Sequence, residues 1–535
     1  MKRFSIITCA AVFAVCFFPG SANAGQWTKV YSGLGNEQDF SISPAAKDGY
    51  YMSGVVPDSS GGDKTYFGKL DSSANVTWVK KLSVFYNDNL NVTPVSDGYR
   101  VTGLSQSEPS SPYPIKSMVW GKFDLNWKPI YQWMYGGFYY LDGAFNDTSD
   151  GGMLWSGTCY SSGQDVLLVK IGPAGTVAWK KGFSINYPYS TATYTISSLS
   201  LCVEVKDGYV ILGTVSQKDS NVALLWIKVS KKDGTVISER LIQPSDGSPF
   251  SYNNYPTRVL LLSDGNILVA GSKVPPYGWI TPVLIKLGAD GRIMWQYAFN
   301  MSGKPNYASS GAWVDAIREN PDHTLLLSGN MSLYGGILSS MFIMELSANG
   351  KTIVWQKKYG TDSEYYAGSL RFDSGDALIS GNYSKDGYTA LQVFFCRLDA
   401  TTFEPMWTET FGTTSNNTYA GGLYYVYGNF FVSGTTRAFG PGTPSVTNVF
   451  GMILGSDGDA FCHITHRNLA TGNPGLTASH FNMGLTGLTY DLKPLSNPTK
   501  AKISVNKASI KASDICNSGS SAGEVSPDEL EAERE

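Results

Sequence analysis

The sequence is poor in charged residues and in histidine. Only 16% of its residues are Asp, Glu, Lys or Arg, four of its 535 residues are His, and its formal net charge is -3. A weakly acidic chain lacks the positive field that attracts a phosphate backbone, so we expect no nucleic-acid partner. HExxH and CxxC motifs are absent, and His463 and His466 would face opposite sides of a strand. We therefore expect no metal site.

A long apolar run occurs only at the start of the chain. Lys2 and Arg3 precede an apolar run that ends near Phe18, and Ala22-Asn23-Ala24 has the small-residue pattern of a cleavage site. Residues 1–24 are therefore predicted to be a signal peptide. No later stretch has the length of a membrane span. We expect an exported monomer, in the periplasm, on the cell surface or outside the cell, with no transmembrane segment in the mature chain.

Cysteine is also scarce, and no two cysteines are adjacent. Five of the seven cysteines would remain after removal of the signal peptide. An oxidising compartment permits disulfides, although spacing alone does not fix their connectivity. Cys159 and Cys202 lie in neighbouring repeats and Cys462 and Cys516 flank the C-terminal region, so these two pairs are the disulfide candidates. Cys396, within the apolar segment VFFCRL, is predicted to be a buried thiol.

What the sequence has in abundance is a repeated unit of apolar segments separated by glycine. In the clearest copy, residues 264–299, an Asp-Gly turn precedes NILVAG, PVLIKL, a GADG turn and RIMWQYAF. Short β-branched runs between Gly and Asp residues are typical of strands. The glycine that ends the first of these strands recurs at spacings of 49 to 58 residues: Gly54, Gly103, Gly157, Gly213, Gly271, Gly329, Gly381 and Gly434.

Each repeat contains a further strand before its Asp-Gly turn, for example Phe40–Ser43 or Arg258–Leu262. A single four-stranded antiparallel sheet cannot bury both of its faces, whereas sheets packed around a common axis can. The predicted fold is therefore an all-β propeller spanning residues 25–466. The orphan N-terminal strand GQWTKVYSG would pair with the last blade and close the ring.

The number of blades depends on how the last repeat ends. Eight blades follow if the N-terminal strand completes the last blade, whereas residues 459–465 could instead supply that blade's own outer strand, and a count of seven stays open. Residues 467–523 lose the repeat but include the alternating segment Ala501–Ile510. Residues 524–535 are acidic and are predicted to be disordered.

Two motifs carry a family resemblance. DGYYMSG and VLLVKIGPAGTVAWKKGF resemble the DGG-Y and Lys-Leu-Asp…Gly…Trp-x-Lys repeats of exported bacterial β-propellers, over roughly residues 26–466. They are distantly similar to the blades of quinoprotein dehydrogenases. That family uses a catalytic Asp, calcium ligands and usually a vicinal cysteine pair, which is absent here. We therefore expect no cofactor and no catalytic residues.

The loops of such a propeller divide between its two faces. Turns between strands one and two and between strands three and four are short and uniform, whereas the remaining loops vary and are rich in tyrosine. Variable loops on a rigid frame are common binding surfaces, and Tyr combines a flat apolar face with a hydroxyl group. The candidate ligand-binding residues are Tyr139, Tyr140, Tyr187, Tyr189, Tyr252, Tyr255, Tyr277, Trp279, Tyr365 and Tyr366. These tyrosines could instead cover the edges of the blades.

Two other repeated residues are predicted to be structural. A basic residue ends the third strand of most repeats, as at Lys170 and Lys286, and is expected to pair with an Asp of a nearby turn rather than to form a cation ring. The aromatic residues on the fourth strands are expected to pack between blades. They are Trp78, Tyr131, Trp179, Trp295, Trp355 and Trp407, and the fourth repeat has only aliphatic residues in this place.

These observations lead to one functional expectation and two alternatives. We expect a non-enzymatic propeller that binds a protein or glycan partner through its variable loops. A quinoprotein-like or glycan-active propeller enzyme is the first alternative. A scaffold for assembly of the cell envelope is the second.

Overall fold

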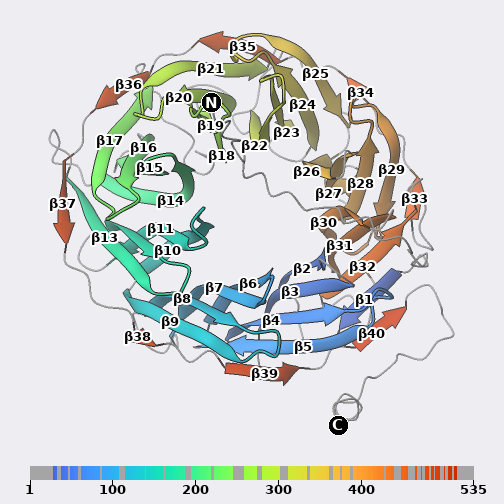
Figure 1. Ribbon diagram of the computed structural model, residues 1–535. Coiled ribbons are helices and arrows are strands. Elements are labelled where there is room, and N and C mark those ends of the chain that lie inside the picture. Colours follow the sequence, from blue (N-terminus) through green and yellow to red (C-terminus); the bar gives the residue numbers. More distant parts are fainter. Residues whose placement is uncertain are drawn as a thin grey trace, which may run out of the picture.

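The computed structural model describes residues 28–514 with gaps, most of which fall in loops (Figure 1). The gaps are 33–37, 46–48, 58–61, 85–86, 108–114, 139, 161–163, 187–193, 218–221, 245–257, 274–279, 302–310, 334–337, 361–364, 374–375, 386–389, 414, 427–428, 439–446, 456–463, 467–470, 473–475, 481–482, 487–488, 494–498, 501–503 and 509–510.

The described strands form an eight-bladed β-propeller, as the repeat predicted (Figure 1). Each blade is an antiparallel sheet whose first strand lies nearest the axis and whose fourth lies at the rim. Blade 1 contains β2 (Gln38–Pro44), β3 (Tyr50–Pro57), β4 (Asp63–Leu70) and β5 (Val76–Ser83). Blade 2 contains β6 (Asn87–Val95), β7 (Gly98–Gln106), β8 (Lys116–Phe123) and β9 (Pro129–Phe138). Blade 3 contains β10 (Tyr140–Asp147), β11 (Met153–Tyr160), β12 (Gln164–Ile171) and β13 (Val177–Asn186).

The next four blades follow in chain order around the ring. Blade 4 contains β14 (Tyr194–Val205), β15 (Gly208–Gln217), β16 (Val222–Ser230) and β17 (Val236–Pro244). Blade 5 contains β18 (Arg258–Leu261), β19 (Ile267–Lys273), β20 (Thr281–Leu287) and β21 (Ile293–Met301). Blade 6 contains β22 (Gly311–Glu319), β23 (Leu325–Leu333), β24 (Leu338–Leu346) and β25 (Ile353–Tyr359). Blade 7 contains β26 (Tyr365–Asp373), β27 (Asp376–Ser384), β28 (Gln392–Leu398) and β29 (Pro405–Phe411).

The ring is closed by the N-terminal strand. Blade 8 contains β30 (Thr418–Val426), β31 (Asn429–Thr436), β32 (Asn448–Leu454) and, as its fourth strand, β1 (Thr28–Ser32). Tyr31 of β1 is buried and donates a hydrogen bond of 2.9 Å from its hydroxyl to the backbone oxygen of Ala74 in blade 1. The expected closure is therefore confirmed, and the alternative count of seven blades is wrong because residues 464–466 pair with blade 7 instead.

The C-terminal segment forms a feature that the sequence did not predict. Its short strands each add a fifth strand to the rim of one blade, and together they encircle the propeller (Figure 1). We call these strands the belt. In chain order they are β33 (Ile464–His466), β34 (Thr471–Gly472), β35 (Leu476–His480), β36 (Met483–Thr486), β37 (Thr489–Lys493), β38 (Thr499–Lys500), β39 (Ser504–Ala508) and β40 (Lys511–Asp514). The strand predicted within Ala501–Ile510 is β39.

The recurring glycine is required by close approach of the first strand. A Cβ atom added to Gly157 would lie 2.2 Å from the backbone oxygen of Asp142, and one added to Gly329 would lie 1.9 Å from that of Trp313. Real Cβ atoms do not approach so closely, so any larger residue would push the first and second strands apart. The repeat therefore keeps glycine where the backbones of the two innermost strands of a blade approach each other closely.

Replacing Gly157 by alanine is expected to destabilise the protein by about 1–3 kcal/mol, the usual cost of overpacking. Gly172→Ala in the same blade is the matched control, because its Cβ would meet nothing closer than 3.7 Å. Urea denaturation of both variants measures the difference. Equal stabilities would contradict the role given to the recurring glycine.

The fourth-strand aromatics pack between blades, as predicted. Tyr131, Trp179 and Trp295 each lie over a glycine of the next blade's last turn, where an added Cβ would come within 2.4–2.5 Å of the ring. These turn glycines have positive φ, a conformation that side chains with a Cβ rarely adopt. Trp355 instead contacts Phe403 of blade 7, with ring centroids 4.8 Å apart. Contact between a fourth-strand aromatic ring and the last turn of the next blade therefore recurs around the rim.

The cysteines that the structure describes are not in disulfides, and the predicted pairing of Cys159 with Cys202 is wrong. Cys159 packs with Trp120 in the core between blades 2 and 3, whereas Cys202 packs against the core between blades 3 and 4. The two thiols therefore lie on opposite sides of blade 3. Cys396 is a buried thiol, as expected. Cys462 and Cys516 lie outside the described residues.

Candidate functional site: the loop face and the inner strands

The strand directions place all the variable loops on one face of the ring. In each blade the first strand ends at a short turn, and the antiparallel second strand returns to the opposite face before the next loop begins. The loops that follow the second and the fourth strand of each blade therefore lie on one face. The loop after β19 and the loop between blades 4 and 5 are examples. We call this the loop face.

Most of the predicted ligand-binding residues lie in loops outside the described residues. This is true of Tyr139, Tyr187, Tyr189, Tyr252, Tyr255, Tyr277 and Trp279. Tyr140 and Tyr365 are described in backbone only, as the first residues of β10 and β26 at the loop face.

Tyr366 is the exception, because its side chain is part of the core. It is 3% exposed, and its ring packs against Tyr383 and Phe394 with centroids 5.0 and 5.2 Å apart. The burial of Tyr366 argues against a contact between its side chain and a ligand.

The opposite face is held together by the repeated Lys–Asp pair. The lysine at the end of the third strand lies 2.6–2.9 Å from an Asp of the turn between strands one and two in the same blade. The pairs are Lys122–Asp97, Lys170–Asp150, Lys228–Asp207 and Lys286–Asp264. These lysines therefore have a structural role within their own blades, as predicted.

Blade 6 keeps a contact at the same place, but here the residue of the third strand accepts the hydrogen bonds and residues beside the turn donate them. Glu345 stands where the lysine would be, and it accepts hydrogen bonds from Asn320 at 3.2 Å and from Thr324 at 2.6 Å. Asn320 and Thr324, which flank the Asp322-His323 turn, thus donate hydrogen bonds where the other blades have a carboxylate acceptor. The break in charge seen in the sequence is thus compensated locally.

The pair in blade 3 is the most buried of those whose lysine is described. Lys170 is 3% exposed in its side chain, whereas Asp150 is 53% exposed. Burial alone would raise the pKa of Asp150, but hydrogen bonds from Lys170, Thr148 and the Gly152 N–H outweigh it and lower the pKa to about 2. Its contribution to stability is present above the unfolded-state pKa of about 3.9 and is lost as pH falls through about 2.

Substituting Asp150 by asparagine is expected to cost about 1–2 kcal/mol, because it leaves the buried Lys170 without its counter-charge. The more exposed pair offers a control, since Asp97→Asn leaves Lys122 able to reach solvent. Denaturation at pH 7 should show a larger loss for Asp150→Asn than for Asp97→Asn. The reverse order would show that burial of the lysine does not set the strength of the pair.

Asp142 and Asp315 lie on two of the innermost strands of the ring, β10 and β22 (Figure 1). Asp142 on β10 is exposed, and Asp315 on β22 is partly buried at a β-bulge opposite Gly329. In the described part of the chain, no three His, Cys, Asp or Glu side chains lie close enough to hold a metal ion.

Asp315 takes part in a hydrogen-bonded contact between blades 6 and 7. It accepts a hydrogen bond from the side-chain amide of Asn330, which also bonds the N–H and carbonyl of Gly368 in blade 7 at 3.0 and 3.1 Å. Burial raises the pKa of Asp315 to about 6, although Asn330 and the charge of Arg258 in blade 5 act to lower it. The native state therefore gains stability from this group as pH falls through about 6 towards the unfolded-state pKa of about 3.9.

Sequence reasoning missed Asp315 because nothing near it marks a site. The only signal was the pair Gly329-Asn330, repeated as Gly381-Asn382 in the next blade. Asn382 accepts a hydrogen bond of 3.2 Å from the N–H of Ala420 in blade 8. The asparagine after the recurring glycine thus bonds the second strand of one blade to the first strand of the next blade. Such a bond depends on the neighbouring blade.

The comparisons with known proteins extend no further than the fold. No protein-family model and no curated protein matches the sequence. A europium-containing methanol dehydrogenase is similar at a TM-score of 0.42 and 9% identity, covering 81% of this chain and 93% of its own. A PL25 ulvan lyase is similar at 0.37 and 8%, covering 69% and 94%. A hypothetical protein from Leishmania major is similar at 0.23 and 11%, covering 59% and 86%.

These similarities carry no argument about what the chain binds or converts. The described residues also include no helix with the length and apolar character needed to cross a bilayer.

Proposed function

We propose that this chain is an exported, non-enzymatic β-propeller that binds a protein or glycan partner through the loop face. The observation that carries the proposal is the difference between the two faces. On one face, short turns are alike and their charged groups bond within the frame, as in the pair Lys170–Asp150. On the other face, the loops that connect the strands differ in length and sequence.

The composition of those loops favours recognition of an extended polar surface. They concentrate tyrosine and asparagine, for example in SPFSYNNYP and KVPPYGWITP. A tyrosine ring offers contact area at low entropic cost, and its hydroxyl can bond to a sugar or a peptide backbone. The signal peptide predicted at residues 1–24 supports placement of the mature chain outside the inner membrane.

The experiment is capture of glycans from an array, and of proteins from an envelope extract, by the immobilised mature protein. The test variant is Tyr277→Ala with Trp279→Ala, and a second variant replaces residues 249–256 by a short Gly-Ser linker. At least one variant should lose binding tenfold or more with unchanged unfolding.

Leu125→Ser on the opposite face is the matched control, since Leu125 is exposed in a turn of blade 2. It should bind as the parent protein does. Undiminished capture by both loop variants would contradict the proposal. A redox-cofactor absorption spectrum, or cleavage of a glycan by the purified protein, would replace it with an enzymatic function.

A further inference from the structure

The belt runs around the ring in the direction opposite to the order of the blades. β33 pairs with β29 of blade 7, the next belt strands pair with blades 6 to 1 in turn, and β40 pairs with β1 of blade 8. Its last two strands therefore need an edge in blade 1 and the closing strand. The belt cannot finish pairing until the whole ring exists.

Each blade holds the belt over only a short length. Two residues pair at β34 and at β38, and five pair at β35, β37 and β39. A backbone hydrogen bond contributes little net free energy, whereas ordering each residue of a strand costs conformational entropy. The backbone alone therefore attaches each belt strand weakly to its blade.

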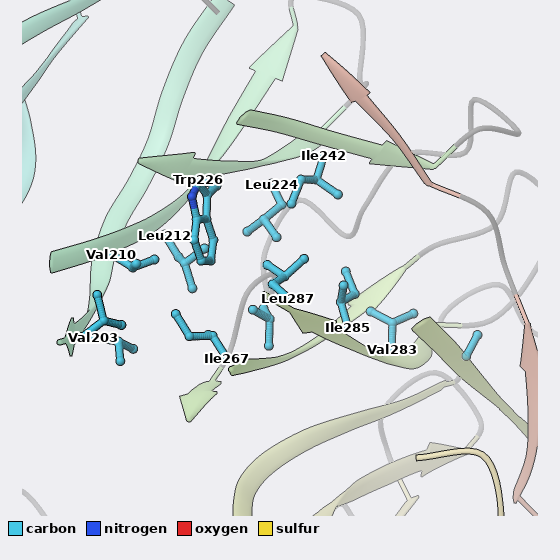
Figure 2. Packing of buried hydrophobic residues seen from close by; sticks show 13 residues of the cluster. Val203, Val210, Leu212, Leu224, Trp226, Ile242, Ile267, Val283, Ile285 and Leu287 are labelled. Carbon is cyan, nitrogen blue, oxygen red and sulfur yellow. The ribbon is translucent and has the colours of Figure 1, made fainter. Parts of the chain in front are cut away.

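The contacts between blades are of another kind. Between blades 4 and 5, for example, Trp226, Leu212, Ile267 and Ile285 are fully buried against one another (Figure 2). Similar clusters of buried side chains from the ring strands occur at the other interfaces. Separating two blades would expose such a core to water, at a cost in free energy that grows with the apolar area exposed.

Release of the belt would uncover the outer edges of the fourth strands. An uncovered edge carries unpaired N–H and C=O groups and accepts an extended chain. The register of β5 with β39, Ser83 opposite Ser504, shows which chain fits such an edge. The belt of a second copy has the same sequence and therefore the same fit.

We infer that the belt, when Cys462 and Cys516 are reduced, is a latch that opens before the blades unfold, and that the edges it leaves take up the belt of a second copy of this chain. Opening of the belt comes first because each belt strand pairs with its blade over at most five residues. Exchange between copies follows because identical belts compete for identical edges. The rim is then an interaction surface for a second copy, distinct from the loop face.

Hydrogen exchange on the full mature chain tests the first part. Both Cys462 and Cys516 are replaced by serine, so that the candidate disulfide plays no role. Amides of residues 464–514 should exchange at least tenfold faster than those of the second and third strands of the blades, and as one group. Equal exchange rates in belt and blades would overturn the latch.

Exchange between copies tests the second part. Two differently tagged versions, each with Cys462→Ser, Cys516→Ser and a protease site inserted in residues 456–460, are mixed in mild denaturant and returned to buffer. Cleavage should then release complexes that combine one version's ring with the other's belt.

A Ser83→Cys, Ser504→Cys variant, oxidised before mixing, should show no such hybrids. Absence of hybrids from the unlocked protein, despite fast exchange in its belt, would overturn a second copy as the occupant. Hybrids at equal yield from the locked protein would also overturn it, since they would form without opening at β39.

Discussion

Replacing Trp226 by alanine is expected to destabilise the protein by about 3–5 kcal/mol, the usual cost of removing a fully buried tryptophan. Trp226 lies on the third strand of blade 4 and is completely buried among aliphatic side chains of blades 4 and 5 (Figure 2). A Cβ added to Gly291 of blade 5 would come within 2.8 Å of its indole nitrogen. Trp226 therefore covers the same turn that fourth-strand aromatics cover elsewhere, in the blade that lacks one.

Ile237→Ala is the matched control for this substitution. Ile237 lies on the fourth strand of the same blade, where other blades carry their exposed residue before the aromatic, and it is 50% exposed. Its loss should cost less than about 1 kcal/mol, since half of its surface already contacts water. Denaturant unfolding measures both variants. A cost for Trp226→Ala no larger than that for Ile237→Ala would show that blade 4 is held by other contacts.

A disulfide between Cys462 and Cys516 is expected to contribute about 4 kcal/mol, from the loop that it would close in the unfolded chain. Both cysteines lie outside the described residues, two positions before β33 and two positions after β40. These strands lie on blades 7 and 8, which are neighbours in the closed ring. The bond would join the two ends of the belt and turn it into a hoop around the propeller.

Thiol titration in denaturant, without reductant, tests this bond. Two thiols lose two protons and two electrons when it forms, and the disulfide of an exported thiol–disulfide oxidoreductase accepts them by exchange. The mature protein should titrate as three thiols, Cys159, Cys202 and Cys396, and as five after reduction. Cys516→Ser should lower stability as much as reductant does. Five thiols before reduction would contradict the bond.

The sequence predicts the ring well because the ring is built from local patterns. Apolar runs between Asp-Gly turns mark strands, and the recurring glycine marks the crossing of the two inner strands of each blade, as at Gly157. The orphan strand at residues 25–33 indicates closure of the ring because no other strands of its own repeat precede it. Each of these signals is contained within a few residues.

The features that were missed depend on neighbours rather than on local pattern. The belt strands span two to five residues, pair through the backbone and follow no repeat, so only Ser504–Ala508 fell within a predicted strand. Cys159 and Cys202 were paired because their repeats adjoin, but the side of the blade that each faces was not visible in the sequence. Trp226 was overlooked because the aromatic was sought on the fourth strand.

The most direct test of the architecture asks whether the two ends of the chain meet in blade 8. Val30 of β1 lies directly opposite Ser513 of β40, a separation that a disulfide can span. In a chain whose other cysteines are replaced, Val30→Cys with Ser513→Cys should oxidise to completion, and Val30→Cys with Ser479→Cys on blade 5 should not. Peptide mapping that finds no link between residues 30 and 513, or an equal link in both variants, would contradict the closed and belted ring.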